Sequence, residues 1–412
     1  MNDEQRLRDR FEAIDTPSSR IGVDEVVRAG RRSVRRRRTV QAAASVALTV
    51  GVLLAVPAIL NRPAGQTDTD RAGNTPVASA SPGASASPGG SASPEVTAPA
   101  LPTGPCEMTT LPVPSGIKQV TAVAVDPTGT YVVGHGVKGQ DFLPVMWTNG
   151  RPHAMPLDGE HGAPVRGKSV EPSAVNASGV VVALAMDARE NYVVRYENGA
   201  YTRLRPPPGN WHHYPTPSIN SDGDVVINVE PQGNSGGKDS IALIWKAGTT
   251  TAQKLPLPEG ANVSGILDDG TVVGTIYKDG MAVAGYAWDQ QGRGRRLDVP
   301  GGYKVAAAYA GRDDWATGGV WNDGEPRAAL WDLRTGKVTV FHKAAPGEAV
   351  NPAGLFVAGG AVMRPDGPTV ELATPDGQRG SAMDVSDTGV VVGLATDSRA
   401  DYDHLGPRLW RC

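Results

Sequence analysis

One short pattern recurs seven times after residue 105, and no other feature of the sequence constrains the fold as strongly. In six copies a residue that is usually Asn, Asp or Ser precedes, by three positions, a glycine at 129, 179, 223, 270, 354 or 389. Such spacing favours a type I turn, and the β-branched residues that follow favour a strand. A seventh, degenerate copy, 310–318, has Asp313 at its centre. Each copy therefore predicts a β-hairpin.

The spacing of the hairpins predicts how they assemble. The seven turns lie 35 to 50 residues apart, about 43 on average. Each hairpin is followed by a third strand with an aromatic or apolar residue before a turn, as in 145–150 (VMWTNG), and by a short, often proline-flanked fourth strand. Proline suits an outermost strand, because the missing N–H is not needed there. A four-stranded unit of this period is typical of propeller blades. We therefore expect an all-β fold, a seven-bladed β-propeller; a six-bladed ring or a pair of β-sandwiches is the alternative.

The two ends of the repeat region complement each other. The last copy stops after its third strand, at 407–412, and the segment 106–116 has the features of a fourth strand without a blade of its own. We expect them to pair in one composite terminal blade. The two cysteines of the chain, Cys106 and Cys412, would then lie side by side and form a disulfide, which is allowed outside the cytoplasm. In the chain-entropy model, closing a loop of this length contributes about 5–6 kcal/mol.

A membrane anchor is expected upstream of the repeats. Residues 40–60 are 21 residues without a charge, and a helix of that length spans about 30 Å of hydrocarbon. Arginines cluster before the run, at 28, 31, 32 and 35–38, and only Arg62 and Arg71 follow closely. This asymmetry places the N-terminus in the cytoplasm and the repeats outside. A cleaved signal peptide is the alternative, but its basic region would be unusually long.

We therefore expect a single-pass protein of the cell membrane with four regions. They are a cytoplasmic stub (1–38), a transmembrane helix in the lipid bilayer (39–61), a disordered stalk rich in Pro, Ser, Ala and Gly (62–104) and an extracytoplasmic β-propeller (105–412). The composition of the stalk favours extended chain that carries the propeller away from the membrane. The stub is too short to bury a core. It is either an unstructured tail or a helical docking peptide for a cytoplasmic regulator.

The charge distribution argues against nucleic acid as a partner. The stub has eleven arginines and seven acidic residues, whereas residues 105–412 carry a net charge of about −6. Phosphate contacts require Lys and Arg on the binding face. The exported domain lacks that excess.

No catalytic constellation stands out in the sequence. We find no H-E-x-x-H motif or cysteine nucleophile, and the histidines other than His212 and His213 are scattered singly. We therefore predict no catalytic residue, no cofactor and no metal site. The segment 220–224 imitates part of a calcium loop but lacks the later glutamate, so a hairpin turn is the better interpretation.

One segment is a candidate binding loop. Trp211, His212, His213 and Tyr214 follow three prolines and a glycine, in what the repeat pattern predicts to be a connection between blades. Aromatic side chains on a rigid loop suit sugar stacking or a protein hot spot. The alternative is that Trp211 only covers the groove between two blades.

A weaker second candidate is an acidic segment before the last strand. Asp397, Asp401 and Asp403 lie there beside Tyr402 and His404. The segment could bind a cation, and a solvated loop is the alternative interpretation.

The repeat resembles a known family. LPVMWTNGRPHAMPLDG (143–159) followed by PSAVNASGVVVALA (172–185) is similar to the HAF repeats, WD40-like units of exported bacterial β-propellers, although the HAF tripeptide itself is absent. The layout of stub, arginine run, Ala-Val anchor and Pro-Ser stalk resembles actinobacterial membrane proteins, including anti-sigma-like regulators. The resemblance implies a propeller fold and leaves the activity open.

These observations favour a binding function. We expect a cell-surface module that binds or senses an extracytoplasmic protein or glycan, with a variant in which the stub signals in an anti-sigma-like manner. An extracytoplasmic lyase or hydrolase that uses the propeller channel is the alternative, and a non-enzymatic role is our prediction.

Overall fold

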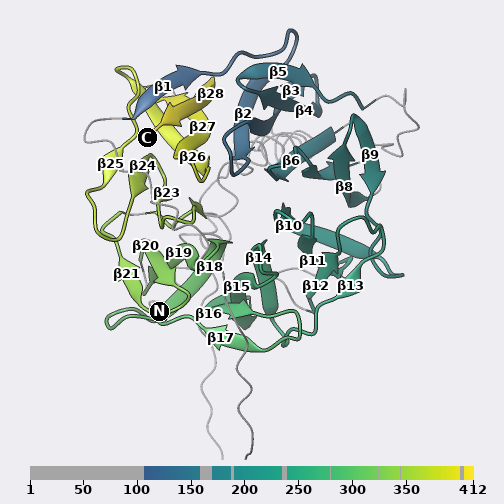
Figure 1. Cartoon of the computed structure of the whole chain (residues 1–412), viewed down its shortest axis with the longest axis vertical. Helices are drawn as coiled ribbons and strands as arrows, with labels where there is room; N and C mark the ends of the chain where they lie inside the picture. The colour runs from purple at the N-terminus through teal and green to yellow at the C-terminus, as the bar shows by residue number, and fades with distance from the viewer. Residues whose placement is uncertain are drawn as a thin grey trace, which may run out of the picture. The chain divides into compact units, whose positions relative to one another are not determined.

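The computed structural model describes residues 106–157, 169–186, 190–233, 239–278, 280–322, 324–343, 345–399 and 403–412. In these residues seven antiparallel sheets of four strands form a ring (Figure 1). The prediction of a seven-bladed β-propeller is confirmed, and the alternatives of six blades or sandwiches are excluded. The predicted stub (1–38), transmembrane helix (39–61) and stalk (62–104) lie outside the described residues. Within the described ranges, no helix has the length and apolar character needed to span a membrane.

Each blade runs from an innermost to an outermost strand. The first three blades are β2 (Lys118–Val125), β3 (Tyr131–Lys138), β4 (Asp141–Thr148) and β5 (Arg151–Ala154); β6 (Ser169–Val175), β7 (Val181–Met186), β8 (Asn191–Glu197) and β9 (Ala200–Arg203); β10 (Trp211–Ile219), β11 (Val225–Pro231), β12 (Ile241–Trp245) and β13 (Gln253–Lys254). The fourth and fifth are β14 (Ala261–Ile266), β15 (Val272–Lys278), β16 (Met281–Trp288) and β17 (Gly294–Arg296); β18 (Val305–Arg312), β19 (Trp315–Trp321), β20 (Arg327–Asp332) and β21 (Val338–Val340). The last two are β22 (Ala349–Val350), β23 (Phe356–Ala358), β24 (Ala361–Met363) and β25 (Val370–Glu371); β26 (Gln378–Val385), β27 (Val390–Asp397), β28 (His404–Arg411) and β1 (Glu107–Thr110).

The last blade is the composite that the sequence predicts. β1 pairs antiparallel with β28, and Cys106 forms a disulfide with Cys412, 306 residues away. The ring is therefore closed both by strand pairing and by a covalent bond. Pairing with β1 also covers the edge that β28 would otherwise expose.

The first hairpin turns explain the repeated Asn-x-x-Gly pattern. The amide of the glycine donates to the carbonyl of the first turn residue, as in Gly179 to Asn176 at 2.9 Å. The Asn176 side chain accepts from its own turn and donates to the carbonyl of Asn220, which in turn donates to that of Leu267. One asparagine thus shapes its turn and ties it to the next blade.

The glycine inside several second strands has a different cause. The innermost strands have a β-bulge, and a Cβ added at Gly134, Gly274, Gly318 or Gly393 would lie 1.9–2.0 Å from a carbonyl oxygen of the innermost strand. The backbones approach too closely for any side chain at these places.

A tryptophan at the end of the third strand joins most blades to the chain that enters them. The indole Nε1 of Trp147 donates to Pro112, that of Trp245 to Arg205, that of Trp331 to Asp298 and that of Trp410 to Ala373, each at 2.7–3.1 Å. These tryptophans are fully buried. Apolar clusters between neighbouring blades complete the core, as between the second and third blades.

Candidate functional site

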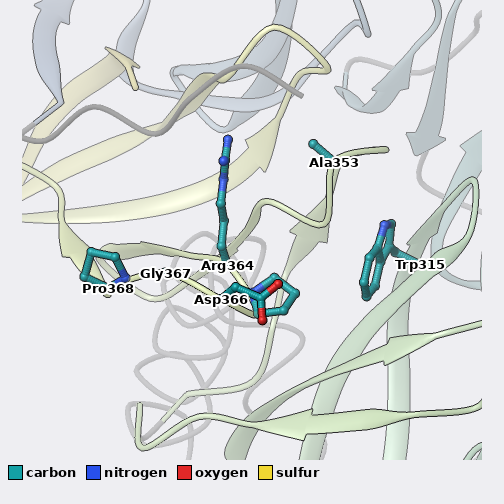
Figure 2. Close-up of a pocket in the computed structure, with 7 residues that line it drawn as sticks. Trp315, Ala353, Arg364, Asp366, Gly367 and Pro368 are labelled. Atoms are coloured by element: carbon teal, nitrogen blue, oxygen red, sulfur yellow. The ribbon is translucent and has the colours of Figure 1, made fainter. Parts of the chain in front are cut away.

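The ring has one face that carries the first hairpin turn of every blade, which we name the turn face. Its turns are 126–129, 176–179, 220–223, 267–270, 312–315, 351–354 and 386–389. A cleft of about 300 Å³ opens there between the fifth and sixth blades. Figure 2 shows its wall on one side, Trp315, and the residues opposite it. The residues that line the cleft are Trp315, Ala353, Arg364, Pro365, Asp366, Gly367 and Pro368.

The fifth blade contributes Trp315 because its turn departs from the repeat. The chain reverses in four residues, with Arg312 paired to Trp315 and Asp313 at a positive φ of 47° in place of the turn glycine. The indole of Trp315 donates to the carbonyl of Pro352 at 3.2 Å and lies over Gly354. A Cβ at Gly354 would be 3.0 Å from the ring. The tryptophan is therefore held in place by the turn of the sixth blade.

The sixth blade contributes the opposite wall through the turn after β24. Two prolines, Pro365 and Pro368, stiffen this turn, and Asp366 is exposed at its tip. Arg364 precedes it and is half-buried, and burial lowers the pKa of its guanidinium. The cleft thus combines an aromatic surface, two proline rings and both signs of charge.

Arg312, beside the cleft, bridges blades that are not neighbours. Its guanidinium pairs with Asp268 of the fourth blade at 3.4 Å and with Asp387 of the seventh at 3.1 Å. Burial acts to lower the pKa of Arg312, but the two carboxylates outweigh it and raise the pKa. Because the fifth and seventh blades are separated by the sixth, this side chain reaches past the sixth blade at the turn face.

Aspartates surround this ion pair. The pKa of Asp313 is raised by burial and by the nearby Asp268, Asp314 and Asp269, although Arg312 opposes the shift. Burial, Asp313 and Asp268 raise the pKa of Asp387, although Arg312 opposes this shift too. These aspartates outnumber Arg312 and make the surface beside the cleft acidic.

The predicted binding loop is not a loop, and this part of the prediction is wrong. Trp211, His212, His213 and Tyr214 form the first half of β10, where they pair with residues of β11 from Pro231 to Asn228. Pairing with β11 begins at Trp211, immediately after the proline-rich segment, so the aromatic run belongs to the strand.

Alternation along β10 gives these four side chains different environments. Trp211 packs between the second and third blades and donates to Pro207, whereas His212 is exposed and His213 is buried. Burial lowers the pKa of His213 to about 4, so it is neutral in the folded protein. The hydroxyl of Tyr214 donates to Asn262 of the fourth blade at 2.9 Å. A binding role for the four residues stays a prediction.

The second predicted candidate is only partly described, since Asp401 and Tyr402 lie outside the described residues. His404 begins β28, and its Nε2 lies 2.8 Å from the hydroxyl of Thr121 in the first blade. Asp397 accepts from the amide of Arg399 in a local turn. In the segment 220–224, the amide of Gly223 donates to the carbonyl of Asn220 at 3.1 Å, as expected of a hairpin turn, and Asp224 pairs with Lys246 at 2.7 Å. Among the described residues, no three His, Cys, Asp or Glu side chains are arranged to hold a metal ion.

Sequence reasoning overlooked Arg312, Trp315 and Arg364. A signal for them existed, because Arg312 and Trp315 lie in the one degenerate copy of the hairpin. Arg364 follows a third strand in which methionine replaces the usual tryptophan.

Comparisons with known proteins support the fold. No protein-family model and no curated protein matches this chain. Among solved structures, an oligogalacturonate lyase in complex with manganese is similar with a TM-score of 0.52 and 11% identity, over 74% of this chain and 93% of that chain. The oligogalacturonate lyase from Vibrio parahaemolyticus has a TM-score of 0.49 and 9% identity over the same shares, 74% and 93%. TolB from Acinetobacter baumannii has a TM-score of 0.38 and 11% identity, over 71% of this chain and 63% of that chain. At such identities the likeness concerns the fold alone.

Proposed function

We propose that this protein is a membrane-tethered binding module whose turn face docks a partner protein outside the cytoplasm. The main observation in support of this proposal is the cleft between the fifth and sixth blades. Its volume of about 300 Å³ lies at the lower end of ligand pockets, which suits one anchoring side chain rather than a whole small molecule. Pockets lined by Trp and Arg are typical of the hot spots of protein interfaces.

The cleft and its surroundings define the chemistry of the partner. An apolar or aromatic side chain would pack between the indole of Trp315 and the rings of Pro365 and Pro368. The aspartates around Arg312 would meet basic residues that flank this anchor. Complementary charge accelerates association and makes it sensitive to salt.

The predicted membrane topology is the second part of the proposal. The predicted anchor at 39–61 and the stalk at 62–104 would hold the propeller at a distance from the membrane, and the stub would relay binding to a cytoplasmic regulator. The disulfide between Cys106 and Cys412 supports an oxidising compartment. We propose a binding rather than an enzymatic role.

Site-specific photo-crosslinking in the full-length protein tests the proposal. Ala353→benzoylphenylalanine places the crosslinker in the cleft, and Met281→benzoylphenylalanine places it in an exposed position on the opposite face. We expect a protein that is captured at position 353 and not at 281.

Purified chain must then reproduce the interaction. We expect Trp315→Ala to lose binding of the captured protein, Pro368→Ala to weaken it, and added salt to weaken it further. Identical capture at both positions, or unchanged binding by Trp315→Ala with a folded propeller, would refute the proposal.

A further inference from the structure

The innermost strands carry a ring of bulged residues at one level around the axis. The register shifts in β2, β6, β14, β18 and β26 leave one extra residue in each, and in the sixth blade both Glu348 and Ala349 face Val357. The bulged residues are Val123, Ser173, Ser264, Tyr309, Glu348 and Met383. All are partly exposed although their strands lie at the centre of the ring. They therefore face the central channel that propellers enclose.

The part of this wall formed by the third to sixth blades is polar and continuous. The hydroxyl of Tyr214 donates to the Oδ1 of Asn262, and the Oγ of Ser240 lies 3.5 Å from the same atom. Tyr277 lies close enough to both Tyr214 and Tyr309 to raise the pKa of each, in addition to burial. The arc of residues thus runs without interruption across the blades.

Glu348 continues the arc on the sixth blade, next to Tyr309. It is partly exposed toward the axis, yet the surrounding protein raises its pKa to about 7. Glu171 on the second blade is similar, with a pKa that burial raises to about 7. Near neutral pH each carboxyl is therefore protonated about half of the time, and the protonated form can donate as well as accept a hydrogen bond.

The turn-face end of the channel carries charged groups. Arg312 ends the strand that carries Tyr309, about 10 Å further along it at 3.3 Å per residue. Its guanidinium pairs with Asp268 of the fourth blade and with Asp387 of the seventh. Asp384 lies at the same end and accepts from the amide of Val125 at 2.9 Å, which ties the seventh blade to the first. The polar arc therefore lies away from these charged groups, toward the opposite face.

We propose that this part of the channel wall binds a neutral carbohydrate through Tyr214, Asn262, Tyr309 and Glu348. Phenol hydroxyls, an amide and a carboxyl that can hold a proton match the alternating donors and acceptors of sugar hydroxyls, and the tyrosine rings provide stacking surfaces. The bulged residues and the polar arc include no Lys or Arg, and Arg312 at the turn face is already paired. A carboxylate bound at these residues would therefore have no cationic partner. This site adds to the proposed protein-binding function and lies on a different part of the molecule from the cleft.

Calorimetric titration of the full-length protein in detergent tests the site. The probes are maltotriose, cellotriose and mannotriose, with trigalacturonate as the anionic counterpart. We expect at least one neutral trisaccharide to bind with a Kd of about 1 mM or tighter. Trigalacturonate is expected to bind more weakly.

Two conservative variants locate the binding to the wall. Tyr309→Phe removes one hydroxyl and keeps the ring, so the affinity is expected to fall about fivefold to tenfold. Glu348→Gln copies the protonated carboxyl and is expected to retain binding, whereas Glu348→Ala is expected to lose it.

The Trp315→Ala variant separates this site from the cleft. It is expected to bind the trisaccharide normally, so failure of the sugar site and failure of the protein-docking proposal are distinguishable. The carbohydrate proposal is overturned if no neutral trisaccharide binds, if Tyr309→Phe binds as the unmodified protein does, or if trigalacturonate binds at least as tightly.

Discussion

The sixth and seventh blades are neighbours in the ring but are built differently. β26, β27 and β28 have eight residues each, whereas the strands of the sixth blade have two or three. Trp410 ends the third strand of the seventh blade and donates to Ala373, whereas Met363 has that place in the sixth blade and has no donor to offer. The blade that closes the ring keeps the full repeat, and the blade beside the cleft has lost much of it. Regular pairing therefore maintains the ring, and departures from it make the cleft.

The largest expected effect comes from opening the closure of the seventh blade. In the double variant Cys106→Ser/Cys412→Ser, β1 is held to β28 only by hydrogen bonds. The chain-entropy model predicts a loss of about 5 kcal/mol in the free energy of unfolding. Denaturant unfolding of the full-length protein measures this loss.

Hydrogen exchange of the same variant compares the two blades. We expect amides of β1 and β28 to lose protection first, while β22–β25 keep the protection they have in the unmodified protein. Loss of protection in the sixth blade before the seventh would contradict the assignment of the closure as the main restraint.

A smaller but still severe effect is expected from Gly393→Ala in β27. The added Cβ would lie 1.9 Å from the carbonyl oxygen of Ser381, so the innermost strand must move. We expect a loss of about 3 kcal/mol in the free energy of unfolding. In the sixth blade the position that corresponds to Gly393 is Ala358. Its Cβ is tolerated because β22 begins only at Ala349 and does not pair with Ala358.

Gly301→Ala is the matched control for this substitution. No atom lies within 4 Å of a Cβ at Gly301, and its φ is not in the left-handed region. The change is expected to alter stability by less than about 0.5 kcal/mol. Equal effects at the two glycines would show that the close approach in β27 does not determine its residue.

An intermediate effect is expected from the two residues that end the third strands. Trp410→Phe leaves the carbonyl of Ala373 without its indole donor and leaves unfilled space, which we expect to cost about 2 kcal/mol. Met363→Leu preserves volume and breaks no hydrogen bond, so a cost below about 1.5 kcal/mol is expected. Thermal unfolding of both variants gives the comparison, and a larger loss from Met363→Leu would reverse it.

The sequence could predict the ring but not the cleft. The period of the glycines and the residues of the turns are local features, and they predict seven blades. The positions of Cys106 and Cys412 at the two ends of the repeats predict the composite last blade. Trp315 and Asp366 are about 50 residues apart and meet only because the ring brings two turns together. The wrong prediction of a loop at 211–214 also has a simple cause. Prolines before Trp211 are typical of a loop, and only the structure shows that the aromatic residues pair with β11.

The smallest expected effect is a pH dependence of stability to which both blades contribute. Burial raises the pKa of both Glu348 and Asp384 to about 7, well above the values of about 4 expected in the unfolded chain. A raised pKa means that the folded state holds the proton more tightly. The contribution of each group to stability is therefore fully present below about pH 4 and is lost as the pH rises through 7.

Only Asp384 has backbone donors that favour its charged form, the amides of Val125 and Val385. Glu348 has burial alone as the cause of its shift. The pKa values of the two groups are nevertheless about equal, so we expect Glu348→Gln and Asp384→Asn each to remove a comparable part of the decline in melting temperature between pH 5 and pH 7. Melting curves of the full-length protein at a series of pH values measure both parts. A Glu348→Gln profile parallel to that of the unmodified protein would mean that the channel wall of the sixth blade is hydrated like an open surface, and the uncharged carboxyl that the carbohydrate site requires would be absent.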